Sequence, residues 1–317
     1  MVKAFGPVPS RRLGRSLGVN NIPPKVCTYS CVYCQVGRTT EMQAERRAFY
    51  EPDEIARDVQ DAIEKASEAG APVDYLTFVP DGEPTLDINL GREIDLLKPL
   101  GIQIAVITNS SLIWREDVRE DLMKADWVSL KVDSVREEVW RRVNRPCRSL
   151  RLKRILDGML EFAGAYRGEL VTETMLVGGV NDNEGLVGDL FTHLKPSTAY
   201  LSIPTRPPAE EWVRAADEKA VNRVYQVLRE RVDRVEVLIG YEGNTFASTG
   251  NVEEDLLSIT SVHPMREDAV DAFLERAGVD WTVVHGLIAK GRLVEIAYEG
   301  HKFYMRKLSR CKRDLLA

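Results

Sequence analysis

Near its N-terminus the sequence reads Val26-Cys27-Thr28-Tyr29-Ser30-Cys31-Val32-Tyr33-Cys34-Gln35, and this stretch holds three of the chain's five cysteines in the spacing C-x3-C-x2-C. Three thiols cannot pair off among themselves as disulfides, and thiolates this close on one loop suit a metal ion or an iron–sulfur cluster. Three ligands on a four-iron cluster would leave one iron open for a substrate or cofactor. The spacing alone also allows a structural zinc site or incidental loop cysteines.

The length and composition of the chain are those of a large α/β protein. With 317 residues, 44% of them hydrophobic, it can form one large barrel, or a barrel-like domain plus a small module. No apolar run reaches the length of about 18 residues that a membrane-spanning helix needs, so no membrane association is expected. The segment Gly6-Pro7-Val8-Pro9 interrupts any N-terminal signal pattern at once. Five cysteines, three of them clustered, fit a reducing compartment, and we expect a cytoplasmic protein.

Charge is unevenly distributed along the chain. The formal net charge is -6, yet residues 1–50 hold eight Lys/Arg against two Glu, and the last 17 residues hold six Lys/Arg against one Asp. Two basic ends on an acidic protein suggest local anion binding, not a uniformly basic coat for nucleic acid. Alternatively, the basic residues at the C-terminus belong to a solvated tail and bind no partner.

Short apolar β-rich runs alternate with amphipathic helical segments over most of the chain. Helices are expected at 51–70, 89–99, 115–124, 135–143, 150–164, 183–195 and 210–231, and strands at 75–79, 102–107, 127–132, 169–177, 199–203 and 234–239. This alternation favours parallel strands with crossover helices. About six such units fall short of the eight that close a full barrel. We therefore predict an α/β fold, a partial (β/α)6 barrel over residues 1–240.

Polar or glycine-rich residues follow five consecutive predicted strands. They are Asp81-Gly82-Glu83, Thr108-Asn109-Ser110, Asp133-Ser134, Gly178-Gly179-Val180-Asn181 and Pro204-Thr205-Arg206. In parallel sheets and barrels the carboxyl ends of the strands carry the functional site. Any one of these segments would be an ordinary turn or cap, but five in succession predict a shared pocket.

The C-terminal part of the chain has a different pattern. Residues 241–252 are expected to form a linker, and residues 253–317 a small domain with helices at 253–260, 265–277 and 280–290 and a hairpin of 293–298 with 302–305. Three helices and a hairpin predict a winged helix. Its third helix is mostly apolar, and the domain holds ten Lys/Arg against eleven Asp/Glu, which argues against sequence-specific DNA binding. Docking of RNA or a peptide, or packing against the barrel, is expected instead.

The cysteine loop resembles the defining motif of the radical S-adenosylmethionine (radical SAM) superfamily, and the resemblance covers most of residues 1–240. It also rests on Tyr33 before the last cysteine and on the segments Asp81-Gly82-Glu83-Pro84, Thr108-Asn109-Ser110 and Glu173-Thr174-Met175-Leu176-Val177-Gly178-Gly179-Val180-Asn181-Asp182. Within the superfamily, two further segments are similar to an uncharacterised group related to the tRNA wyosine-base synthases: Gly6-Pro7-Val8-Pro9-Ser10-Arg11-Arg12-Leu13-Gly14 and Ser202-Ile203-Pro204-Thr205-Arg206-Pro207-Pro208.

This resemblance implies a cofactor pair and a reaction. Cys27, Cys31 and Cys34 would ligate three irons of a [4Fe–4S] cluster, and S-adenosylmethionine (SAM) would chelate the fourth. A reductant such as ferredoxin or flavodoxin would supply the electron that cleaves SAM to methionine and a 5′-deoxyadenosyl radical, which abstracts hydrogen from a substrate. The SAM contacts implied are Tyr33, Gly82, Glu83, Asn109, Asp133, Gly178 and Gly179.

The chain departs from the family pattern at two places. The usual Gly-Gly-Glu-Pro reads Asp81-Gly82-Glu83-Pro84, and Asp81 would either disturb the turn or add a hydrogen-bond acceptor. Cys147 and Cys311 are too few and too far apart to hold a second cluster. The wyosine-base synthases carry an additional cysteine set, so their specific reaction is in doubt for this chain.

Several charged residues fall near the predicted pocket. Glu173 lies on a strand expected to be buried, where a carboxylate is costly without a partner. Glu173 would either form an ion pair with Lys131 in the core or have a role in substrate binding. Arginines near the cluster or at the sixth strand exit would hold an anionic substrate or the SAM carboxylate; they are Arg11, Arg12, Arg15 and Arg206.

The sequence therefore predicts a radical SAM enzyme that modifies a macromolecule, with tRNA ahead of a peptide as substrate. The alternative is a non-catalytic regulator that binds zinc or a redox-sensing cluster at the same cysteines and uses the winged helix as its output. The polar strand exits argue against a regulator, because it has no use for a SAM-shaped pocket.

Overall fold

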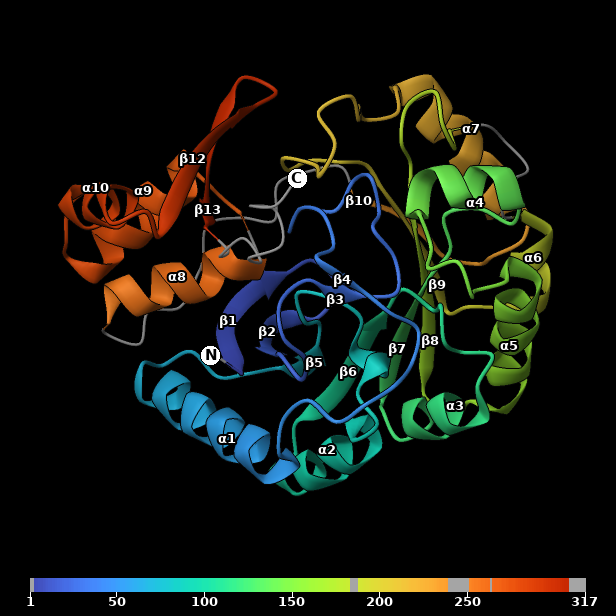
Figure 1. Ribbon diagram of the computed structural model, residues 1–317, viewed down its shortest axis with the longest axis horizontal. Helices are drawn as coiled ribbons and strands as arrows, with labels where there is room; N and C mark the ends of the chain where they lie inside the picture. The colour runs from blue at the N-terminus through green and yellow to red at the C-terminus, as the bar shows by residue number, and fades with distance from the viewer. Residues whose placement is uncertain (1–2, 183–187, 239–250, 263, 308–317) are drawn as a thin grey trace, which may run out of the picture.

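The computed structural model describes residues 3–182, 188–238, 251–262 and 264–307, and Figure 1 shows a curled sheet with helices along its outer side. Eight strands form this sheet in the order β1-β2-β5-β6-β7-β8-β9-β10. Strand β1 is antiparallel to β2, and every other neighbouring pair is parallel. The strands are β1 (Ala4–Ser10), β2 (Gly14–Val19), β5 (Tyr75–Phe78), β6 (Gln103–Thr108), β7 (Trp127–Lys131), β8 (Glu169–Met175), β9 (Thr198–Ser202) and β10 (Val235–Leu238).

The predicted α/β partial barrel is confirmed, and the six predicted strands are β5 to β10. Strands β1 and β2, which extend the sheet beyond β5, were not predicted. Strand β2 contains two glycines and a serine and has little intrinsic β-propensity. It is a strand because it pairs in parallel with β5, with Leu17 opposite Leu76 in register.

Most crossover helices lie where their apolar periodicity predicts them. They are α1 (Pro52–Glu68), α2 (Leu90–Leu97), α3 (Glu116–Leu122), α4 (Glu137–Asn144), α5 (Leu152–Ala165), α6 (Gly188–Leu194) and α7 (Glu218–Arg229), with short 3-10 turns at Pro84–Leu86 and Lys98–Leu100. Their apolar faces pack on the sheet around large buried side chains such as Phe78, Phe162 and Phe191. The first five residues of the predicted helix at 183–195 lie outside the described residues.

The predicted long helix at 210–231 is wrong at its start. Helix α7 begins at Glu218, where the Asp217 side chain caps it by accepting a hydrogen bond of 2.8 Å from the Ala220 amide. Residues before the cap are held elsewhere: the Glu210 amide donates to the Val32 carbonyl at 3.1 Å, which pins this segment to the cysteine loop. We call residues 203–210 the strap.

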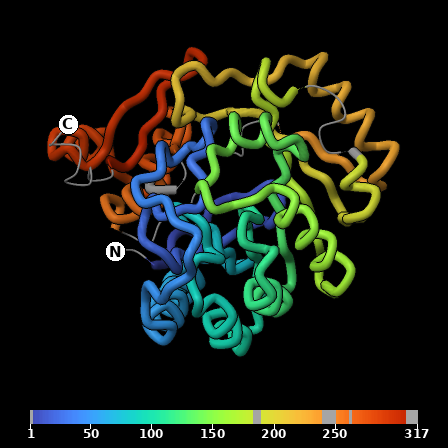
Figure 2. Tube along the Cα trace, turned by 45° about the vertical axis from the view of Figure 1, so that its right-hand side comes forward, coloured from blue at the N-terminus to red at the C-terminus, as the bar shows by residue number. Residues whose placement is uncertain are grey.

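A second unit at the C-terminus has its own core. It comprises α8 (Val252–Val262), β11 (Met265–Arg266), α9 (Glu267–Ala277), α10 (Thr282–Ala289), β12 (Leu293–Tyr298) and β13 (His301–Arg306), and its sheet has the order β11-β13-β12. Figures 1 and 2 both show it beside the N-terminal strand, and Val8 of β1 packs against its core. The three helices and the hairpin are where they were expected; their assignment as a winged helix and the domain boundaries stay predictions. The expected linker falls almost wholly on residues outside the described part.

The C-terminal unit also touches the barrel at a second point. The Tyr298 hydroxyl at the end of β12 donates to the Pro204 carbonyl of the strap at 3.2 Å. Across the described residues, no helix is both long and apolar enough to cross a bilayer.

Candidate functional site

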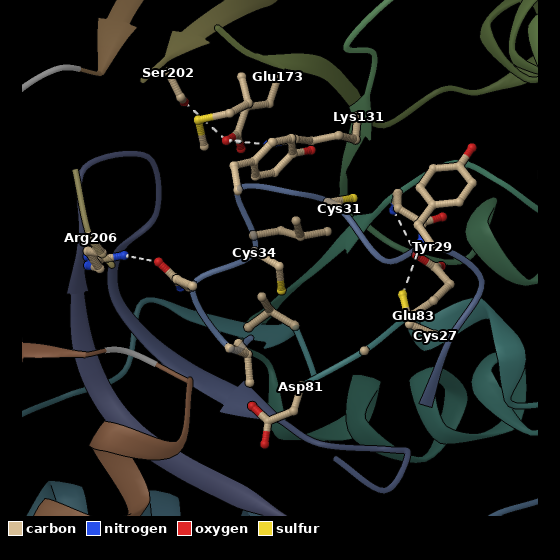
Figure 3. Close-up of a pocket in the computed structure, with 18 of the residues that line it drawn as sticks. Cys27, Tyr29, Cys31, Cys34, Asp81, Glu83, Lys131, Glu173, Ser202 and Arg206 are labelled. Atoms are coloured by element: carbon tan, nitrogen blue, oxygen red, sulfur yellow. Dashed lines mark hydrogen bonds and ion pairs between the residues drawn. The ribbon is translucent and has the colours of Figure 1, made fainter. Parts of the chain in front are cut away.

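A cavity of about 310 Å³ opens where the parallel strands end. Its lining includes residues that follow β5, β6 and β9, residues within the last part of β7 and β8, and the cysteine loop. This loop connects β2 to α1 and includes the two-residue strands β3 (Val26–Cys27) and β4 (Glu41–Met42). Figure 3 shows Cys27, Cys31 and Cys34 gathered around one space, with Glu173 and Ser202 on one side and Asp81 on the other. A pocket is therefore present, and three of the five predicted exit segments line it, those after β5, β6 and β9; Asp133-Ser134 and Gly178-Gly179-Val180-Asn181 do not.

The cysteine loop is held by the end of helix α4 and the loop after it. The Val32 amide donates to the Val143 carbonyl at 2.9 Å, and the Ser30 amide donates to the Asn144 carbonyl at 3.0 Å. The Cys147 amide donates to the Thr28 carbonyl at 2.9 Å. Such backbone pairing fixes a loop without regular structure, because each bond satisfies a group that would otherwise need water.

Each of the three sulfurs has a nitrogen donor of its own. The side-chain amide of Asn109 lies 3.5 Å from Cys27 Sγ, and that of Asn144 lies 3.5 Å from Cys31 Sγ. Lys25 Nζ lies 3.9 Å from Cys34 Sγ. Donors to sulfur are the partners that tune an iron–sulfur cluster. The cysteines with their donors thus fit a [4Fe–4S] cluster on three thiolates.

Burial makes these thiols hard to ionise without a positive charge between them. It raises the pKa of Cys27 to about 12, and the nearby Glu83 carboxylate adds to the effect. The pKa of Cys31 is raised for the same first reason, with Asp133 as the second cause. Coordinated thiols are deprotonated because the metal supplies the missing charge, so the pocket favours a thiolate only with a metal centre bound.

Gly82 and Glu83 form the tight turn that faces this loop. A Cβ at Gly82 would lie 1.9 Å from the Val26 carbonyl oxygen, so only glycine fits there. The buried Glu83 carboxylate accepts from the hydroxyls of Thr85 and Thr108, each at 2.6 Å, and from the Asn109 amide at 2.7 Å. Burial raises the pKa of Glu83, and these bonds offset part of that shift. Glu83 therefore orders the exit of β6 and lines the cavity.

Asp81 adds an acceptor to this turn and does not break it. The side chain is 4% exposed, lines the cavity, and its Oδ1 has no hydrogen-bond partner among the described residues. Burial raises the pKa of Asp81 to about 7, against the opposing charges of Lys25 and Arg306. A buried carboxyl oxygen without a hydrogen-bond partner is costly. Asp81 occupies the position at which the radical SAM motif usually has its first glycine.

Tyr33 and Asp133 interact with each other beside the cluster loop. The Tyr33 hydroxyl donates to Asp133 Oδ2, Asn144 donates to the same oxygen at 2.6 Å, and the Met175 amide donates to Oδ1 at 2.9 Å. Tyr33 lines the cavity but Asp133 does not. Asp133 thus positions Tyr33 and Asn144, and direct contact with SAM stays a prediction.

A second charged cluster closes the other side of the cavity. Glu173 accepts from Lys131 at 2.9 Å, from Ser202 at 3.1 Å, and from Arg12 of the β1–β2 turn. Burial alone would raise the pKa of Glu173, but Lys131 and Arg12 hold it well below its ordinary range. The predicted ion pair between Glu173 and Lys131 is present, and because all three charged residues line the cavity, a substrate role is compatible with it.

The remaining predicted residues divide between the cavity and its surroundings. Arg206 lines the cavity and donates to Gln35 at 2.7 Å, and Arg11 lines it as well. Arg15 instead pairs with Asp74 at the surface. Gly178 and Gly179 lie outside the lining; the Gly178 amide donates to the Arg214 carbonyl at 2.9 Å, so their contact with SAM stays a prediction.

Three residues that matter to this site were not predicted from the sequence. Asn144 and Lys25 are the donors to two sulfurs, and Glu210 joins the strap to the loop by accepting from Arg38 at 2.9 Å. No spacing rule points to Asn144 or Glu210, because they approach the loop only through folding. Lys25, two residues before Cys27, was the one with a local signal.

Comparisons with known proteins agree with this geometry. A family model described as the radical SAM superfamily matches residues 21–187, which is more than half of the chain. The UPF0026 protein of Methanocaldococcus jannaschii is 46% identical over 313 residues and is covered to 97%, as is this chain. The UPF0026 protein of Synechocystis is 36% identical over 206 residues, 64% of this chain and 76% of that protein.

Solved structures with low sequence identity share the fold. A radical SAM methyltransferase from Sphaerobacter thermophilus matches with a TM-score of 0.54 at 18% identity, over 71% of this chain and 66% of that one. TYW1 with a lysine–pyruvate adduct bound matches with a TM-score of 0.52 at 16% identity, over 69% of this chain and 74% of that one. Streptococcus suis SuiB bound to S-adenosylmethionine matches with a TM-score of 0.51 at 13% identity, over 68% of this chain and 49% of that one. Since the family match spans the cysteine loop and most of the pocket, the chain belongs to the radical SAM superfamily and is a radical SAM enzyme whose cofactors are a [4Fe–4S] cluster and SAM.

Proposed function

We propose that the enzyme cleaves SAM reductively and removes a hydrogen atom from a substrate held in the same cavity. When bound, the cofactor pair supplies a one-electron cleavage of SAM to methionine and a 5′-deoxyadenosyl radical. The observation that carries the proposal is the set of three cavity-facing thiols, each with its own nitrogen donor and opposed by the Gly82-Glu83 turn.

The chain's own residues bind, orient and exclude water. Asn109 and Asn144 hold two sulfurs in place, and Glu83 fixes the turn through its hydroxyl and amide donors. The apolar side chains Met175, Ile203 and Leu238 contribute to the lining beyond the cysteines. Apolar groups that exclude water limit the side reactions of a reactive radical.

The charges of the lining support an anionic group on the substrate. Five cationic side chains line the cavity against three carboxylates: Arg11, Arg12, Lys25, Lys131 and Arg206 against Asp81, Glu83 and Glu173. Arginine suits phosphate or carboxylate because its planar fork donates two parallel hydrogen bonds. We therefore propose a tRNA as substrate ahead of a peptide; SuiB of Streptococcus suis, bound to precursor peptide SuiA, is the structural neighbour that keeps the peptide as second candidate.

The core proposal is tested by anaerobic reconstitution. We expect about four irons per chain and formation of 5′-deoxyadenosine from SAM only when a reductant is present. Cys31→Ala should abolish both, whereas Cys147→Ala should abolish neither, because Cys147 does not line the cavity. One zinc per chain and no 5′-deoxyadenosine would favour a metal-binding regulator instead.

The substrate proposal is tested separately by titrating the reconstituted enzyme with bulk tRNA over a salt series. Phosphate contacts should make the affinity fall steeply as salt rises. Failure to bind tRNA even at low salt would reject it as substrate, while leaving SAM cleavage standing.

A further inference from the structure

A run of basic residues lies next to the cysteine loop. Residues 136–154 hold eight Lys/Arg against two Glu, on a chain whose formal net charge is -6. We call the eight basic residues the arginine face. They lie just before α4, on α4, on the first turn of α5 and on the loop between the two helices, and are Arg136, Arg141, Arg142, Arg145, Arg148, Arg151, Lys153 and Arg154.

Most of the arginine face is open to solvent, and its charge is only partly compensated. All of its members except Arg145 are exposed. Arg141 pairs with Glu137 at 2.6 Å and Lys153 pairs with Asp157 at 2.8 Å. Arg142 and Arg148 have no acidic partner among the described residues. A surface with this excess attracts anions over about a Debye length.

Glu210 brings one more arginine to this surface. Its carboxylate accepts from Arg38 at 2.9 and 3.0 Å and also from Arg145. Arg38 follows the third cysteine and its side chain is 70% exposed. One carboxylate between two guanidinium groups leaves net positive charge at the edge of the cysteine loop.

The arginine face adjoins the cysteine loop but does not line the cavity. The backbone of 143–147 bonds directly to residues 28–32, and Asn144 donates to Cys31 Sγ at 3.5 Å. No member of the arginine face lines the cavity, whereas all three cluster cysteines do. A molecule docked on this face would therefore be close to the cluster ligands but would not enter the substrate cavity.

We infer that the arginine face is the docking surface for an acidic protein that carries one electron at low potential. The inference rests on the proposed function, which requires one electron per cleavage. The carrier is oxidised by one electron, the cluster is reduced by the same electron, and no proton or group is transferred. Charge complementarity of this kind steers encounter and fixes orientation, and electron-transfer complexes are small and transient.

A nucleic acid is the other anionic macromolecule that this charge would attract. An RNA substrate, however, has to place its reacting atom in the cavity, and the arginine face contributes nothing to the cavity lining. Proximity to Cys31 is a requirement for electron transfer and is irrelevant to phosphate binding. These two observations favour the electron carrier.

The test compares reductants on the reconstituted full-length protein. Cluster reduction is followed anaerobically by bleaching of its visible absorbance, with reduced flavodoxin, reduced ferredoxin, or photoreduced deazaflavin as an uncharged small reductant. The variant Arg142→Glu/Arg148→Glu reverses two exposed charges without an acidic partner. Lys65→Glu/Lys219→Glu makes the same change in net charge on α1 and α7, outside the arginine face.

We expect reduction by the carrier proteins to slow about tenfold or more at low salt in the arginine variant, and only slightly in the lysine control. Deazaflavin should reduce all three proteins at the same rate. Equal rates with the carriers in the wild type and the arginine variant would overturn the inference. So would a wild-type rate with both carriers that does not depend on salt.

Two further outcomes separate the alternatives. Loss of tRNA binding in the arginine variant, with carrier-driven reduction unchanged, would overturn the inference and assign the face to RNA. If deazaflavin reduces the cluster but no 5′-deoxyadenosine forms, the proposed function fails while the docking result stands on the reduction rates alone.

Discussion

The side-chain amide of Asn144 lies 3.5 Å from the Cys31 sulfur and 2.6 Å from the Asp133 carboxylate. One buried residue at the end of helix α4 thus links a cluster ligand to the group that holds the Tyr33 hydroxyl. A hydrogen bond to sulfur favours the reduced cluster, because reduction adds negative charge that the donor stabilises.

Replacing Asn144 should therefore lower the reduction potential of the cluster. We expect Asn144→Ala to shift it negative by roughly 50 mV, since about 59 mV corresponds to a tenfold change for one electron. A redox titration followed by electron paramagnetic resonance measures the shift. Asn89→Ala, at the start of α2, is the matched control. An unchanged potential would mean that this contact does not tune the cluster.

Glu210 should control how firmly the cysteine loop retains iron. In Glu210→Gln the carboxylate that joins Arg38 and Arg145 is lost, and the loop gains freedom to open. We expect iron to be released to a chelator several-fold faster, while the free energy of unfolding of the apoprotein changes by about 1 kcal/mol or less, as for other partly exposed ion pairs. Glu211→Gln, one residue along and exposed, is the control. Identical release rates in both variants would contradict this role.

Asp81 should make SAM binding depend on pH. Burial raises the pKa of Asp81 to about 7, so the carboxyl is neutral below that pH and charged above it. SAM carries a sulfonium and an ammonium against one carboxylate, and a cation binds more tightly to a cavity with one more negative charge. The affinity of the reconstituted enzyme for SAM should rise several-fold between about pH 6 and pH 8.

Equilibrium dialysis at both pH values measures this rise. Asp81→Asn should bind SAM with little pH dependence, whereas Asp61→Asn, on the exposed side of α1, should behave like the wild type. If Asp81→Asn keeps the full dependence, another group is responsible.

Glu93 should reduce stability as the pH rises. Burial, reinforced by the charge of Asp87, raises the pKa of Glu93 from 4.5 to about 9. The folded chain then holds a proton that the unfolded chain releases above pH 4.5, so the free energy of unfolding falls between those two values. Glu93→Gln stays neutral, so its stability relative to the wild type should rise by about 4 kcal/mol from pH 5 to pH 8.

Urea unfolding at the two pH values tests this expectation. Glu68→Gln at the exposed end of α1 serves as control, because its carboxyl is exposed to solvent. A stabilisation by Glu93→Gln that is equal at both pH values would show that proton binding is not its cause.

Local sequence signals were sufficient for strands β5 to β10 and for the metal-binding loop. The apolar runs that became β5 to β10 carry their own β-propensity, and the spacing of Cys27, Cys31 and Cys34 is a property of one short segment. Strand β2 and the start of α7 were not predictable in this way. Strand β2 depends on pairing with β5. The start of α7 depends on the hydrogen bond from the Glu210 amide to the cysteine loop.

The sequence by itself determined that three thiolates would share one loop and that polar groups would follow successive parallel strands, because both follow from spacing and period along the chain. Only the tertiary structure decided which donor serves each sulfur, and that Arg12 and Lys131 share Glu173. It also decided that the arginine face lies against the cluster loop. These contacts join residues up to 161 positions apart. No local pattern encodes which distant side chain fills a given position around a buried group.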